Sequence, residues 1–425
     1  MLNNKSLPVS NIMWSLMAKL FAMVFYFCAD VFYARTLGVV LYAEWVFFFS
    51  IAHMAFYIGW FGINTSVKVH ISKNNCRDNC VGAAIKVRLF FSIIITTAIF
   101  LIVPLFVDKI GYPYPYAELK NLLYIMSGML FFNSLTDFYK QLYVGTQEFK
   151  MLCAVTAFEY FLYCFFSVAF LKIYNNPVSI AIGYCIAGMV ITVGSFLLLI
   201  KKYNYKLVKK GTKDKELQKK IVEYALPLVV TSIGGLILME MDTFMLGLLG
   251  TEQQVAAYSI AKQLVSKATN VNMAIWTGTV ASLVMITKER YEEKKKEFKN
   301  VNKLNNVVAI CISLCFIIFG DVAIKVIYGK AYLEASKILI MLVPYYILYC
   351  CSSFYAGFLD FMGRARRRAV WYTSVIVINL SLNYVLIPIY GGAGAAVATV
   401  ISLIPYTIYC IYDIRNIFIN KFSFL

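Results

Sequence analysis

The sequence has few charged residues and none of the short motifs that mark an active site. Only 15% of its 425 residues are charged, and the mean hydropathy is +0.71, which excludes a soluble globular domain of this size. It contains no Gly-x-Ser-x-Gly, no His-Glu-x-x-His and no glycine-rich phosphate loop, which are the usual signs of hydrolases, metalloproteases and nucleotide-binding enzymes. We therefore expect a polytopic membrane protein that is not an enzyme and needs no cofactor.

The spacing of the cysteines indicates neither a disulfide framework nor a structural metal site. The 11 cysteines are scattered, mostly in apolar stretches, where cysteine acts as a small hydrophobic residue. Cys76 and Cys80, with His70 nearby, lack the second ligand pair of a zinc site, so we expect no metal. The opening residues MLNNKSLPVSN lack the apolar core of a removable signal peptide.

Long apolar runs fill most of the chain, and runs of about 20 such residues predict transmembrane helices. We predict twelve spans, and therefore an all-α membrane fold, at residues 11–33, 39–62, 84–107, 119–141, 150–172, 178–200, 222–249, 254–287, 304–327, 334–361, 369–389 and 394–414.

The basic residues lie mainly between these spans and predict their orientation. The formal net charge of +18 would suggest a nucleic-acid partner in a soluble protein, but here we expect none. Most lysines and arginines fall in the even-numbered connections, which the positive-inside rule places in the cytoplasm together with both termini. The basic segment 201–220 is either an amphipathic linker on an anionic leaflet or a plain topology signal.

An internal repeat is indicated by two acids about half a chain apart. Asp30 and Asp242 are each followed by an apolar run that ends in Leu-Gly. Six spans precede the basic linker and six follow it. We therefore predict two facing six-helix lobes, residues 1–212 and 213–425.

Charged residues at membrane depth are candidate functional residues. On insertion scales a charge at mid-bilayer costs roughly 2.5 to 3.5 kcal/mol, so Lys19, near the centre of the first span, is interpreted as lining a polar cavity. The alternative is an interfacial lysine that reaches the headgroups. The same cost applies to Asp30 and Asp242, which we interpret either as coupling residues for H+ or Na+ or as counter-charges to the lysines.

Three further residues are predicted to contact substrate. The eighth span has a polar stripe that includes Lys262, with Lys267 close to it. Serine and threonine in such a stripe can bond neighbouring helices, but lysine does not suit that role. His53 on the second span is expected to face the cavity, with a purely structural role as the alternative.

Several longer stretches have a recognisable pattern: ARTLGVVLYAEWVFFFSIAHMAFYIGWFGINTSV at 34–67, ALPLVVTSIGGLILMEMDTFMLGLLG at 225–250, VIYGKAYLEASKILIMLVP at 326–344, the turn LDFMGRARRRAV, and NLSLNYVLIPIYGGAGAAVATVIS at 379–402. These stretches resemble polysaccharide flippases, the Wzx-type O-antigen and oligosaccharide-lipid transporters of the multidrug/oligosaccharidyl-lipid/polysaccharide exporter superfamily. The resemblance implies two six-helix lobes around a central cavity, as in MATE and MurJ transporters.

The resemblance also implies a function. Such proteins move an oligosaccharide on a polyprenyl phosphate or diphosphate from the cytoplasmic to the outer leaflet by alternating access. Relatives line the cavity with cationic side chains, commonly arginines, whereas this sequence offers Lys19, His53 and Lys262. Lysine attracts a diphosphate as a point charge but lacks the guanidinium fork. We expect a monomer in the cell membrane whose partners are the bilayer and a lipid-linked oligosaccharide.

Two other functions stay open from the sequence. A drug or metabolite exporter of the same superfamily would have a more acidic and aromatic cavity. A membrane glycan polymerase or ligase would be an enzyme, but the short outer connections leave little room for a catalytic loop.

Overall fold

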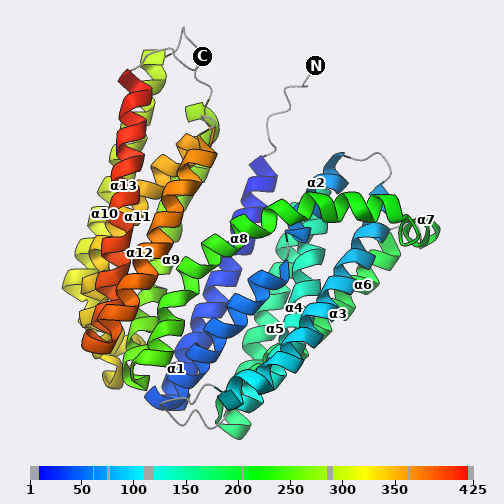
Figure 1. Ribbon diagram of the computed structural model, residues 1–425, viewed down its shortest axis with the longest axis horizontal. Coiled ribbons are helices and arrows are strands. Elements are labelled where there is room, and N and C mark those ends of the chain that lie inside the picture. Colours follow the sequence, from blue (N-terminus) through cyan, green and yellow to red (C-terminus); the bar gives the residue numbers. More distant parts are fainter. Residues whose placement is uncertain are drawn as a thin grey trace. The chain divides into compact units, whose positions relative to one another are not determined.

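The computed structural model describes residues 9–60, 62–73, 77–109, 119–202, 205–284, 291–361 and 364–419. In this part of the chain the backbone is helical apart from short turns, and no strand occurs there. The all-α fold predicted from the sequence is confirmed (Figure 1). Close contacts divide the chain into two compact units, Met1–Glu240 and Met241–Leu425.

Each unit is built of long helices joined by short turns. The first unit contains α1 (Val9–Trp60), α2 (Ile63–Lys73), α3 (Arg77–Lys109), α4 (Leu119–Gly145), α5 (Phe149–Tyr174), α6 (Pro177–Lys202), α7 (Tyr205–Gly211) and most of α8 (Lys215–Leu249). The second unit contains the end of α8, then α9 (Glu252–Val284), α10 (Tyr291–Ile327), the short 3-10 helix η1 (Lys330–Tyr332), α11 (Glu334–Phe361), α12 (Ala365–Tyr390) and α13 (Gly392–Ile419).

Each predicted span falls on one of these helices. The first two spans are the two legs of α1, which meet at Gly38. Its φ of 72° interrupts the α-helical geometry, and glycine adopts this conformation without steric cost. Among the described residues, 7 helical stretches are long and apolar enough to cross a membrane. Of the helices that carry predicted spans, α4, α8 and α9 are not among these stretches. Helix α9 contains Lys262 and Lys267, and charged side chains of this kind lower the mean hydropathy of a helix.

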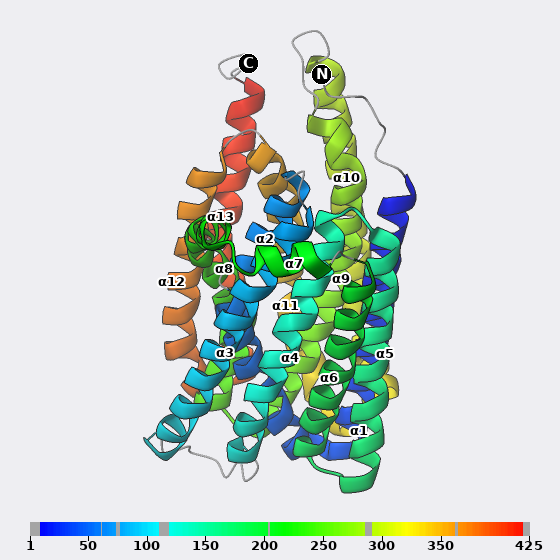
Figure 2. The same ribbon diagram turned by 90° about the vertical axis from the view of Figure 1, so that its right-hand side faces the viewer.

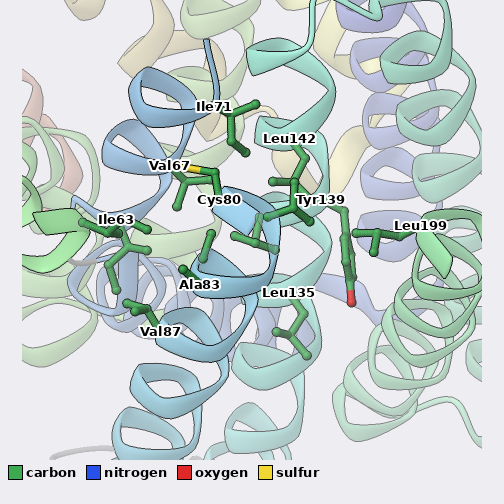
Figure 3. Packing of buried hydrophobic residues seen from close by; sticks show 14 of the residues in the cluster. Ile63, Val67, Ile71, Cys80, Ala83, Val87, Leu135, Tyr139, Leu142 and Leu199 are labelled. Atoms are coloured by element: carbon green, nitrogen blue, oxygen red, sulfur yellow. The ribbon is translucent and has the colours of Figure 1, made fainter. Parts of the chain in front are cut away.

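The core of the first unit packs α2, α3 and α4 together and includes the start of α8. Figure 3 shows apolar side chains of these helices pointing toward one another. The cluster consists of Ile63, Val67, Ile71, Cys80, Val81, Ala83, Ala84, Val87, Leu135, Phe138, Tyr139, Leu142, Leu199, Ile221 and Ala225. The beginning of α8 therefore belongs to the first unit.

The short helix α7 crosses α3 at a glycine on each helix (Figure 2). A Cβ atom on Gly82 would lie 2.0 Å from the carbonyl oxygen of Val208, and one on Gly211 would lie 2.0 Å from the carbonyl oxygen of Asn79. Both oxygens belong to the backbone, so neither can move aside without moving its helix. The basic linker is therefore held against the first unit by a close helix crossing.

In the second unit α11 packs against α9, α10 and α13, and α12 packs along α13. Buried amides connect three of these helices. Asn272 of α9 donates to Asn305 Oδ1 of α10 at 2.9 Å, and Tyr346 of α11 donates to Asn272 Oδ1 at 2.7 Å. Hydrogen bonds between spanning helices satisfy polar groups that lipid cannot.

The contact boundary at Glu240 lies inside α8, after the basic linker in which the sequence placed the lobe boundary at 212. The two positions describe different properties, because a repeat marks equivalent segments whereas contacts mark which residues pack together. The lobe boundary stays a prediction.

We predict that Gly82→Ala lowers the thermal unfolding temperature of the purified protein. The added methyl group meets backbone at the α3–α7 crossing, and overpacking of this kind costs about 1–3 kcal/mol. The matched control is Gly194→Ala in α6, where a Cβ would meet nothing within 4 Å and alanine favours the helix. Equal melting temperatures for the two variants would contradict the close crossing.

Candidate functional site

Asp30 is buried at 3% exposure and bonded across the two legs of α1. The hydroxyl of Tyr42, on the second leg, donates to Asp30 Oδ1 at 3.1 Å and lies 3.2 Å from Oδ2. The tyrosine side chain is itself fully buried. The fold thus satisfies this carboxylate within the first unit.

Asp242, on α8, is buried in the second unit and surrounded by neutral donors. Its Oδ2 accepts from the Tyr258 hydroxyl of α9 at 2.9 Å and from the Thr399 hydroxyl of α13 at 3.0 Å. Its Oδ1 accepts from Asn383 Nδ2 of α12 at 2.6 Å. Three other helices of the unit thus converge on one carboxylate.

Lys262 lies beside this carboxylate site. Its side chain is half-buried, and Nζ donates to the Thr243 hydroxyl at 3.1 Å. Thr243 directly follows Asp242 on α8, so the hydrogen bond brings Lys262 of α9 to the residue next to the predicted acid. Lys267 is also half-buried and lies five residues further along α9, about 8 Å along the helix axis.

His53, on the second leg of α1, pairs with a carboxylate that the sequence analysis did not select. Its Nδ1 lies 3.0 Å from Glu240 Oε1, and its ring centroid lies 4.2 Å from that of Phe49. The His53 side chain is 38% exposed. The sequence did contain a signal for this partner, since Glu240 lies in the same apolar run as Asp242.

Lys19 is exposed on the first leg of α1. It precedes Asp30 by eleven residues on that leg, which corresponds to about 16 Å along the helix axis. The two residues therefore do not form the charge pair that the sequence analysis offered as one role for Asp30. Lys19 stays a predicted substrate contact.

A second group of charges lies in the first unit, where the sequence indicates Asp137 and Glu159 as acids at membrane depth but does not indicate their partner Lys140. Lys140 Nζ of α4 lies 3.0 Å from Glu159 Oε2 of α5 and 3.6 Å from Asp137 Oδ1 of α4. Asn64 of α2 donates to Asp137 as well. The spacing of Asp137 and Lys140 was a signal for one helix face, but the partners on α5 and α2 depend on tertiary packing.

The described residues contain no group of three or more His, Cys, Asp or Glu side chains that could hold a metal ion. Cys80 is buried and is not part of a disulfide with another described residue, whereas Cys76 lies outside the described residues. At Asp242 the carboxylate meets two hydroxyl groups, those of Tyr258 and Thr399, and the amide nitrogen of Asn383.

The family of the chain follows from its sequence. A family model described as a polysaccharide biosynthesis protein matches residues 9–281, more than half of the chain. The chain belongs to this family. A second model, MatE, matches residues 227–385. The family resemblance drawn from the sequence stretches is thereby confirmed.

Among curated proteins, this member of the polysaccharide biosynthesis protein family is similar to the "Probable low-salt glycan biosynthesis flippase Agl15" of Haloferax volcanii. The two are 26% identical over 241 residues, which are 56% of this chain and 50% of the relative. The chain thus spans half the length of that relative.

Solved transporters share the fold. An inward-facing multidrug resistance MATE family transporter of the MOP superfamily superposes with a TM-score of 0.75 at 14% identity, covering 96% of this chain and 98% of that chain. The lipid II flippase MurJ in its inward closed conformation gives 0.72 at 16% identity, covering 96% and 90%. The MATE-like and MurJ-like membrane fold expected for this family member is confirmed.

We predict that Tyr258→Phe destabilises the protein because it removes one donor from the buried carboxylate of Asp242. Leaving such a group short of a hydrogen bond costs about 1–3 kcal/mol. Tyr384→Phe is the control, since this tyrosine is 70% exposed on α12. Thermal unfolding in detergent compares the two variants, and an unchanged melting temperature for Tyr258→Phe would contradict the hydrogen bond.

Proposed function

We propose that the protein moves an oligosaccharide linked to a polyprenyl phosphate or diphosphate from the cytoplasmic to the outer leaflet by alternating access. The product would serve cell-surface polysaccharide biosynthesis, as O-antigen does in lipopolysaccharide. The observation that carries the proposal is the polysaccharide biosynthesis family match over residues 9–281. The MurJ-like fold and the similarity to a probable glycan flippase support it.

The cationic residues suit the phosphate part of such a substrate. Lys262 and Lys267 lie on one helix of the second unit, and Lys19 and His53 lie on α1 of the first. Lysine attracts a phosphate as a point charge, which permits release after each transfer. With the cell interior negative, outward movement of one negative charge gains about 2.3 kcal/mol per 100 mV.

The Asp242 site suits a coupling cation. Asn383 donates to Asp242 through Nδ2, while its Oδ1 is buried and has no hydrogen-bond partner among the described residues. Buried acceptors are normally paired. Rotation of the Asn383 amide would turn this oxygen toward Asp242, where it would join the carboxylate and the Thr399 hydroxyl as a ligand of Na+, or would accept from a protonated carboxyl. We propose Na+ as the coupling cation at this site, with H+ as the alternative ion and Asp30 as the alternative coupling residue.

The second candidate function is export of a drug or metabolite. The MatE model match over residues 227–385 favours it specifically. The two functions predict different substrates for the same cavity, so competition experiments with glycan-lipids and organic cations separate them. In both cases we propose a monomer in the cell membrane with cytoplasmic termini.

Single replacement of Lys19 or Lys262 by alanine is predicted to lower glycan export by at least about tenfold, because a charged hydrogen bond contributes about 1.5–3 kcal/mol. Lys262→Arg keeps the charge and should restore export. Lys325→Ala, an exposed lysine in the last turn of α10, is the control. Outer-leaflet glycan is measured in cells at matched protein abundance, and unchanged export in both alanine variants would contradict the substrate site.

Asp242→Asn is predicted to abolish the dependence of transport on a Na+ gradient while downhill exchange of substrate continues. The replacement keeps the shape of the side chain but removes the charge that holds the cation. Transport by reconstituted protein is measured with Na+ or choline gradients at constant pH. Dependence on a pH gradient alone in the unaltered protein would favour H+ instead.

A further inference from the structure

Positively charged side chains gather at the N-terminus of α12, although the helix dipole disfavours positive charge at that end. Arg364 caps the helix, and Arg367 and Arg368 lie in its first turns within the sequence GRARRR. The N-terminus of a helix carries roughly half a positive charge of its own, and an adjacent cation loses about 0.3–1 kcal/mol. The segment holds four arginines, and this charge favours the approach of a negatively charged group.

One source of that charge is Asp413 of α13, which is fully buried. It contacts Arg364 through Oδ1, and Arg367 Nη1 lies 3.7 Å from the same oxygen. The Tyr409 hydroxyl donates to Asp413 Oδ2 at 3.1 Å. Asp413 therefore forms ion pairs with two of the arginines, and the contact with Arg367 is the longer one.

Aromatic rings hold the exposed arginine in place. The Arg367 guanidinium lies over the Tyr409 ring, 5.9 Å from its centroid. The Trp371 ring stacks on the same tyrosine, with the two ring centroids 5.2 Å apart. Arg368 Nη1 donates to the Tyr406 hydroxyl at 3.2 Å. Arg367 nevertheless remains 61% exposed. A positioned and exposed guanidinium offers the planar fork that matches phosphate oxygens.

An exposed apolar stripe continues from Arg367 along α12. It consists of Val370, Val377 and Tyr384, which are 69%, 58% and 70% exposed. Val370 follows Arg367 by three residues, and the three stripe residues are spaced by seven, which places all four on one helix face. Trp371 is adjacent to Val370 in the sequence. Tryptophan is enriched at the level of lipid headgroups, so this face has an interfacial end and an acyl-chain end.

We propose that this face of α12 is a binding site for an anionic phospholipid, with its phosphate headgroup at Arg367 and Arg368 and its acyl chain along Val370 and Val377. The site belongs to the second unit alone and is independent of the transport substrate. The bound headgroup brings negative charge to the exposed guanidinium of Arg367 at the arginine-rich helix end.

The test is native mass spectrometry of the detergent-purified protein titrated with phosphatidylglycerol, phosphatidylcholine and undecaprenyl diphosphate. We expect selective retention of phosphatidylglycerol over phosphatidylcholine. Arg367→Gln should weaken that retention roughly fivefold, because one basic residue near an anionic lipid surface contributes about 1 kcal/mol.

Arg415→Gln is the matched control, since it removes the same charge from an exposed position of α13 close to Asp413 and should leave retention unchanged. An equal loss in both variants, or no loss in Arg367→Gln, would overturn the proposal. So would selective loss of undecaprenyl diphosphate alone, which would assign these arginines to the transport substrate. If Arg367→Gln melts at a lower temperature than the unaltered protein, Arg368→Gln replaces it under the same criteria.

Discussion

A carboxylate at membrane depth must find its hydrogen-bond donors inside the protein, and this constraint determines how the polar parts of both units are built. Asp30 takes a phenol from the other leg of α1. Asp242 takes donors from α9, α12 and α13. Because no donor comes from lipid, these helices must pack around the acid, and the position of one charged residue thereby specifies the packing of several helices.

The two acids differ in a way that bears on function. Asp242 has three neutral donors, and the Asn383 amide that supplies one of them has a buried Oδ1 with no hydrogen-bond partner among the described residues. Lys262 of α9 donates to Thr243, the residue of α8 that follows Asp242. In the proposed mechanism a cation at Asp242 would cancel the carboxylate's field at this lysine and so strengthen its attraction for phosphate. The coupling charge on α8 and the substrate charge on α9 would then act on each other across the α8–α9 contact at Thr243, which is the differential interaction that coupled transport requires.

The sequence was sufficient for the features that depend on local composition. The apolar runs, the all-α class and the selection of Asp242 follow from hydropathy and from the cost of a buried charge. The partners of these residues could not be predicted, because they come from distant helices. Asn383 and Thr399 lie more than a hundred residues from Asp242, and Glu240 meets His53 only after α8 packs on α1. Lys140 was missed for the same reason, since Glu159 belongs to another helix.

Movement of a lipid-linked glycan between leaflets can be measured in proteoliposomes that contain the purified protein and a fluorescent polyprenyl diphosphate oligosaccharide. An impermeant reagent that destroys the dye outside the vesicle measures how much substrate reaches the outer leaflet. We expect the protein to expose the inner pool within minutes, Lys262→Ala to slow this exposure, and organic cations not to compete. An inner pool that stays protected in the presence of folded protein would show that the protein does not flip this substrate.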